Sequence, residues 1–97
     1  MRVRILESAL ADLDRGRIFY EAQKEGLGDY FLDAMFAEID SLVLFAGIHR
    51  QVFGYHRVIS RRFPYAVYYR MEDAAVALVW RVLDLRQAPR KLRKAVK

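Results

Sequence analysis

Apolar side chains recur at helical spacing between residues 32 and 46, and this repeat constrains the fold more than any other feature of the sequence. The repeating positions are Leu32, Met35, Phe36, Ile39, Leu42, Val43 and Ala46. They predict one apolar stripe along a helix, with the acidic residues Asp33, Glu38 and Asp40 opposite the stripe or at its margin. A helix with such a stripe has to pack it against another apolar surface, which the rest of the chain must supply.

A second helix is predicted just before it, over residues 9 to 24. Ser8 is suited to cap that helix, because a serine hydroxyl can accept from a free amide of the first turn. Ile18 and Phe19 fall outside its apolar stripe, and if exposed they would offer a contact surface. The turn that follows, from Gly26 to Asp29, predicts a glycine stop and then an acidic cap at Asp29. So short a link predicts an antiparallel helical hairpin.

The second half of the chain is predicted to form β-strands. Residues 55–60, 65–71 and 75–85 are rich in Val, Tyr, Ile and Leu, and short turns separate them, so they predict an antiparallel meander. A strand over residues 2–6 precedes the helices, and Pro89 introduces a short basic helix at the end of the chain. The predicted fold class is therefore α+β, in the order β-α-α-β-β-β-α, with the helical hairpin packed on one face of an antiparallel sheet.

Strict alternation divides the two long strands into faces. One face of the 65–71 strand would carry Tyr65, Val67 and Tyr69, and the other would carry Ala66, Tyr68 and Arg70. In the last strand, alternation sets Val76, Leu78, Trp80 and Val82 against Ala77, Val79, Arg81 and Leu83. The sequence leaves open which face is buried.

Charge is divided unevenly along the chain. Residues 1–48 carry 5 Lys+Arg and 9 Asp+Glu, whereas residues 49–97 carry 12 and 3, so the net charge of +5 comes from the second half. A positive field of this kind attracts nucleic acid or an acidic protein.

Composition excludes several classes of protein. The absence of cysteine excludes disulfides and thiol catalysis, and two histidines without an acidic cluster predict no metal and no cofactor. The apolar run from Ala74 to Trp80 is far shorter than the ~18 residues of a membrane span, so we expect no membrane partner and a cytoplasmic location. At 97 residues, the chain is expected to form a single domain over 1–97.

The order of elements and several motifs resemble the RelE/ParE superfamily of bacterial toxins from type II toxin–antitoxin systems. The resemblance covers almost the whole chain and includes Ala11-Asp12-Leu13, the Gly-Leu-Gly turn, GYHRVISRRFPYAVYYRMED and VALVWRVLDLRQAP. Its most specific part is the segment from Arg62 to Arg70, which is similar to the Phe-Pro-Tyr strand of the ParE-like branch often labelled plasmid stabilisation proteins.

The resemblance implies a toxin that inhibits an essential target, either DNA gyrase or the ribosome, and that a cognate antitoxin neutralises. RelE-like members cut messenger RNA on the ribosome, whereas ParE-like members poison gyrase. Asp84 and Gln87 stand where many members of the branch have His and Arg, and Ala66 stands at the strand arginine of the nuclease branch. No Tyr or His follows Trp80, so the C-terminal tyrosine of RelE-like nucleases is also missing. These departures favour inhibition by binding. The alternatives are a RelE-type messenger endoribonuclease and a degenerate, non-toxic binding homologue.

The candidate site residues are mostly arginines. Arg57, Arg61 and Arg86 are candidates for stabilising a phosphate in catalysis, since the guanidinium fork matches phosphate oxygens. Arginine is a poor base, however, and His56 is more simply interpreted as a solvated or hydrogen-bonded edge residue than as a catalytic base. Asp84 is expected to pair with a nearby arginine. The candidates for binding a nucleic acid or another target are Arg62, Arg81, Tyr68, Arg90 and Lys91.

Overall fold

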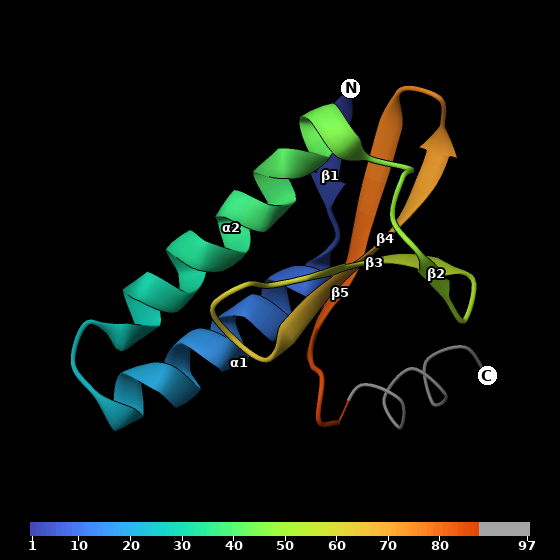
Figure 1. The fold of residues 1–97 in the computed structure, drawn as a ribbon. Helices are drawn as coiled ribbons and strands as arrows, with labels where there is room; N and C mark the ends of the chain where they lie inside the picture. Colours follow the sequence, from blue (N-terminus) through green and yellow to red (C-terminus); the bar gives the residue numbers. More distant parts are fainter. Residues whose placement is uncertain (88–97) are drawn as a thin grey trace.

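Two helices lie side by side across one face of a five-stranded sheet (Figure 1). The computed structural model describes residues 1–87, so the predicted basic helix after Pro89 lies outside the described residues. The elements are β1 (Arg2–Ile5), α1 (Glu7–Gln23), α2 (Leu27–Phe45), β2 (Gln51–Val52), β3 (Tyr55–Ile59), β4 (Tyr65–Asp73) and β5 (Val76–Asp84). Neither helix is long and apolar enough to span a membrane, within the range described.

The sheet confirms the predicted α+β class and the antiparallel meander of β3, β4 and β5. Its strand order is β1-β5-β4-β3-β2. β1 joins the edge of the sheet parallel to β5, with Arg2 beside Val76 and Ile5 beside Val79. The pattern did not predict β2, because two residues are too few to show an alternation.

The helical hairpin is confirmed, but both predicted caps are wrong. α1 begins at Glu7, and the hydroxyl of Ser8 instead donates to the backbone carbonyl of Trp80 at 2.6 Å. α2 begins after Gly26, whose φ of 86° lies in the left-handed region, and Asp29 falls within the first turn. The Glu21 carboxylate accepts from the N–H groups of Gly26 and Gly28 at 3.0 and 2.9 Å, and these bonds lower the pKa of Glu21. Glu21 thereby joins the end of one helix to the start of the next.

The main core lies between the helices and the sheet. Met35, Ile39 and Leu42 are buried as predicted, whereas Val43 remains 49% exposed because it sits at the margin of the stripe. The fully buried Phe31, which the predicted stripe omitted, packs against the rings of Tyr20, Phe63 and Tyr65 with centroids 4.9 to 5.1 Å away. From β4, the core takes Tyr65, Val67 and Tyr69.

The opposite face of the sheet carries a smaller cluster of Ala66, Tyr68 and Leu83. The predicted division of the last strand is wrong for Val82 and Leu83: Val82 packs with Ala77 and Val79 on the helix side, and Leu83 lies on the opposite face. The cause is a register shift: Tyr68 pairs with Arg81, but Tyr69 pairs with Val79, so Trp80 is an extra residue in β5. Such a bulge reverses the alternation beyond it.

Candidate functional site

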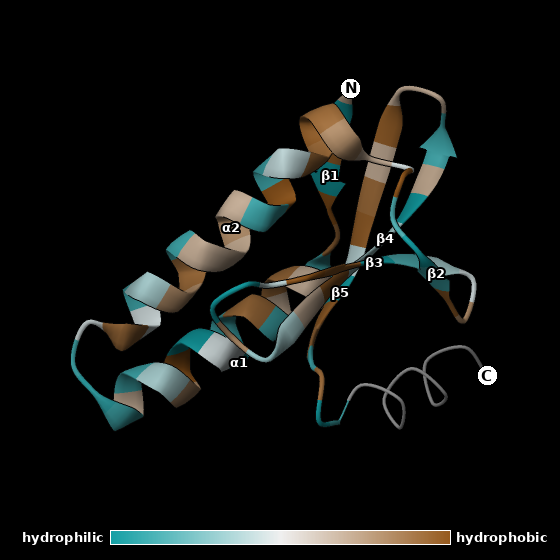
Figure 2. Cartoon of the chain, in the orientation of Figure 1, coloured by the Kyte–Doolittle hydropathy of each residue, from teal (hydrophilic) through white to brown (hydrophobic). Residues whose placement is uncertain are grey.

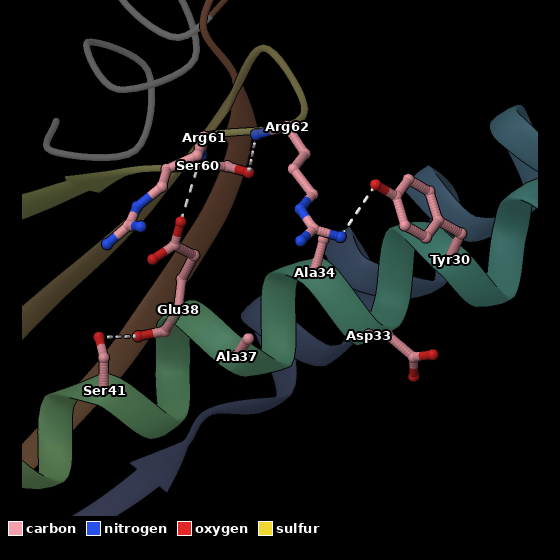
Figure 3. A pocket seen from close by; sticks show the side chains of 9 residues that line it. All are labelled: Tyr30, Asp33, Ala34, Ala37, Glu38, Ser41, Ser60, Arg61 and Arg62. Carbon is pink, nitrogen blue, oxygen red and sulfur yellow. Dashed lines mark hydrogen bonds between the residues drawn. The ribbon is translucent and has the colours of Figure 1, made fainter.

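A groove between α2 and the loop from β3 to β4 brings two of the predicted arginines together with carboxylates (Figure 3). Its cavity has a volume of about 360 Å³. Arg61 and Arg62 come from the loop, whereas Asp33 and Glu38 come from α2. The other lining residues are Tyr30, Ala34, Ala37, Ser41 and Ser60. The groove therefore offers charges of both signs to a partner.

Hydrogen bonds hold the loop against α2 and orient Arg62. Ser60 Oγ accepts from the backbone N–H of Arg62, and the N–H of Arg61 donates to Glu38 Oε2, both at 3.2 Å. The guanidinium of Arg62 donates to Tyr30 Oη at 2.9 Å and lies 5.5 Å from the centre of that ring. The Arg61 guanidinium forms no ion pair with a carboxylate in the described part of the chain.

Arg57 lies beside Tyr68 on the face of the sheet that points away from the helices. The Tyr68 ring is fully buried, and its hydroxyl has no hydrogen-bond partner among the described residues. Burial raises the pKa of Tyr68; the nearby Arg57 guanidinium opposes this shift, although its geometry is not that of a hydrogen bond. A buried ring cannot stack on a base unless this face opens.

Arg81 is tied to α1 by a carboxylate. Its guanidinium donates to both oxygens of Asp12 at 2.7 and 2.9 Å, and Asp12 also accepts from the N–H of Val82 at 2.9 Å. These bonds to Asp12 raise the pKa of Arg81. Because the Asp12 side chain is only 3% exposed, the pair fastens β5 to α1 from within the structure.

Arg86 follows β5 and is held by Asp84. The guanidinium donates to the two carboxylate oxygens at 3.0 and 2.6 Å, and the N–H of Arg86 donates to the same group at 2.8 Å. The hydrogen bond to Asp84 raises the pKa of Arg86, whose side chain is still 65% exposed. The predicted pairing of Asp84 with a nearby arginine is confirmed.

Both histidines are hydrogen-bonded near β2, which for His56 is one of the two environments expected from the sequence. His56 Nδ1 donates to the backbone carbonyl of His49 at 2.7 Å. Tyr69 Oη accepts from the N–H of Gly47 at 2.8 Å and is also hydrogen-bonded to His49 Nδ1. Burial lowers the pKa of His49, and the neighbouring His56 adds to the shift, which Glu38 opposes.

The three arginines considered for catalysis thus lie in different surroundings. Arg57 is on the face of the sheet that points away from the helices, Arg61 is at the α2 groove and Arg86 is beyond the end of β5. Arg90 and Lys91 lie outside the described residues. The functional roles of all these residues stay predictions.

Sequence analysis overlooked the partners of these arginines. Tyr30 and Glu38 meet the β3–β4 loop, and Asp12 meets Arg81, across 69 residues of chain. Asp12 offered one signal, since it is a carboxylate one residue from the buried Leu13 and so near the apolar stripe of α1. No spacing in the sequence pairs it with Arg81.

Comparison with known proteins identifies a family and a similar fold for this chain. The model of a family described as the ParE toxin of type II toxin–antitoxin systems matches residues 3–89. A solved structure described as a chromosomal ParDE toxin–antitoxin system from P. aeruginosa is similar, with a TM-score of 0.70 and 19% identity, over 84% of this chain and 92% of that one. At 19% identity, the similarity between the two structures shows a shared fold and nothing further. No curated protein sequence matches this chain.

Proposed function

The chain belongs to the ParE toxin family of type II toxin–antitoxin systems, and from this premise we propose that it acts in the cytoplasm by binding DNA gyrase rather than by cutting RNA. Cleavage of RNA by attack of a 2′-hydroxyl needs a base, a stabilised phosphate and an acid around one bond. The observation that supports binding is the separation of Arg57, Arg61 and Arg86, each in surroundings of its own.

The histidines support the same proposal. Each imidazole is hydrogen-bonded near β2 through its Nδ1 atom, to the His49 carbonyl in one case and to Tyr69 in the other. Arginine hardly deprotonates at neutral pH, so the three arginines offer positive charge without a general base. Charge of this kind suits recognition of an acidic protein surface.

We also propose that a cognate antitoxin neutralises this protein, since the similar structure is described as a ParDE toxin–antitoxin system. Exposed apolar side chains on the helical hairpin support such a contact. Ile18 and Phe19 on α1 are about half exposed, and the apolar C-terminal end of α2 leads to Ile48, which is 75% exposed (Figure 2). An antitoxin could bury these groups while its carboxylates meet the arginines.

Expression and supercoiling assays test the proposed activity. We expect induction of the soluble chain to arrest bacterial growth, and the purified protein to block negative supercoiling by gyrase in vitro while cellular messages stay intact. Arg17→Ala is a suitable control, because the salt bridge of Arg17 among the described residues is with Asp14 on its own helix. Growth that continues despite abundant soluble protein would show that the chain is not an active toxin.

The nuclease alternative predicts a different result. Messages would be cut in the ribosomal A site, and Arg86→Ala would raise the barrier to cleavage by about 2–4 kcal/mol, as loss of one preorganised donor does. The exposure of Arg86 makes this substitution compatible with folding. Such cleavage, with gyrase unaffected, would refute the proposal.

A further inference from the structure

The face of the sheet that points away from both helices carries a row of arginines. The register places Arg4 of β1 beside Leu78 of β5, and Leu78 beside Arg70 of β4. Val3 and Ile5 pack into the core on the helix side, so Arg2 and Arg4 alternate to the opposite face. Arg57 of β3 lies on that face as well, opposite Tyr68.

An apolar pocket opens within this row. Leu6, Tyr55, Leu78 and Trp80 line it together with Arg70, and its volume is about 200 Å³. The rings of Tyr55 and Trp80 are stacked with their centroids 4.0 Å apart, and the Arg70 guanidinium lies 5.4 Å from the centre of the Tyr55 ring. The pocket therefore combines aromatic and aliphatic walls with one cation.

The described residues supply few carboxylates to the arginines around the pocket. Within residues 1–87, Arg2, Arg57 and Arg70 form no ion pair with a carboxylate. Arg4 has one acidic neighbour, Glu72, at 3.9 Å, and both side chains are about half exposed. Complementary charge has to come from a partner.

We propose that this surface, made of Arg2, Arg4, Arg57, Arg70 and the pocket, binds an acidic peptide segment that inserts one apolar side chain into the pocket. This inference rests on the proposed function, under which the peptide segment is part of the antitoxin. Carboxylates on either side of the apolar residue pair with the arginines, and the pocket takes the side chain between them. Desolvated guanidinium groups then gain acceptors, and apolar area is buried in the same contact.

The ring arrangement favours a peptide over a stacked nucleic acid base. A base needs an aromatic face to lie on. On this side of the sheet, Tyr68 is fully buried, and the Tyr55 ring already contacts both Trp80 and Arg70. An aliphatic or aromatic side chain entering the pocket needs only its apolar walls.

Trp80 makes the proposal directly measurable, because it is the one tryptophan of the chain and lines the pocket. The probe is a short synthetic peptide without Trp or Tyr, with a Leu-Phe pair flanked by glutamates, titrated into the full-length protein while Trp80 fluorescence is followed. We expect a saturable change that weakens with salt. Arg70→Gln should weaken binding by about tenfold, since a hydrogen bond to a charged group is lost.

Three controls make the result decisive. Arg17→Gln removes an arginine from α1 and should leave the affinity unchanged, whereas Arg4→Gln, at the opposite side of Leu78, should weaken it. Thermal melts of all variants check that they are folded. A peptide of glutamates alone should bind more weakly than the Leu-Phe peptide.

Other outcomes would overturn the proposal. They are an unchanged Trp80 signal at millimolar peptide, equal binding by Arg70→Gln, equal binding of the all-glutamate peptide, or a larger saturable change with single-stranded oligoadenylate, which would assign the face to RNA. None of these measurements involves gyrase or growth, so the proposed function and this inference can fail separately.

Discussion

Replacing Gly16 by alanine tests how closely the two helices pack. In a helix interior, alanine is favoured over glycine by about 1 kcal/mol, so propensity alone predicts a more stable protein. A Cβ built at Gly16, however, lies 2.5 Å from both Cε2 and Cζ of Phe31. The Phe31 ring is fully buried among three other aromatic rings, so it has little room to move away.

The steric clash between the new Cβ and the Phe31 ring should destabilise the protein by more than the higher helix propensity of alanine stabilises it. Overpacking in a core costs about 1–3 kcal/mol, and the crowded Phe31 ring favours the upper part of that range. We therefore expect Gly16→Ala to lower the free energy of unfolding by about 1–2 kcal/mol. In a Phe31→Leu background the shorter side chain removes the clash, and the same substitution should become neutral or stabilising by up to about 1 kcal/mol.

Urea unfolding of the four proteins in this double-mutant cycle measures the coupling between the two positions. A coupling of roughly 2 kcal/mol is expected. A Gly16→Ala protein more stable than the wild type, or a coupling below about 0.5 kcal/mol, would refute the argument. Either result would mean that α1 and α2 can move apart to accommodate the methyl group without a loss of free energy of unfolding.

Two further predictions concern polar groups in the fold. Asp12→Ala should lower the free energy of unfolding by about 3–5 kcal/mol, because it removes the acceptor of both the Arg81 guanidinium and the N–H of Val82. Arg81→Leu keeps the hydrogen bond between Val82 and Asp12, so it should lower the free energy of unfolding by less. Equal losses for the two variants in urea unfolding would contradict this prediction. The lowered pKa of His49 means that the folded state disfavours its protonation, so stability should be fully present above pH 6.5 and fall as the pH drops below this ordinary value. His49→Gln should flatten that dependence, measured by urea midpoints across pH 5 to 7.5, and an unchanged slope would show that another group is responsible.

The sequence predicted the elements whose periodicity is long and regular. The meander and the helical hairpin follow from apolar repeats that local physics enforces. The bulge at Trp80 could not be predicted, because one extra residue in a strand leaves no mark on composition and yet transfers Val82 to the other face. Ser8 failed as a cap for a related reason, since its hydroxyl bonds to a strand 72 residues away.

The candidate site shows the same limit. Arg61 and Arg62 could be selected as charged residues beside a turn, but their partners on α2 come from another part of the chain. Arg70 was placed with Ala66 and Tyr68 by alternation, and the structure confirms that grouping through its neighbours. What alternation could not supply is which face the helices leave uncovered, because that depends on how they dock.

The parallel pairing of β1 with β5 also affects the order in which the protein can be completed during synthesis. β1 leaves the ribosome first, yet its partner strand begins roughly 70 residues later. At about 5–20 residues per second, several seconds pass before Val76 is available to Arg2. Through this interval the helical hairpin has no finished sheet beneath it, because β4 and β5 come last. The edge pairing of β1 therefore forms only after β5 has been synthesised, so the sheet closes on its earliest strand last.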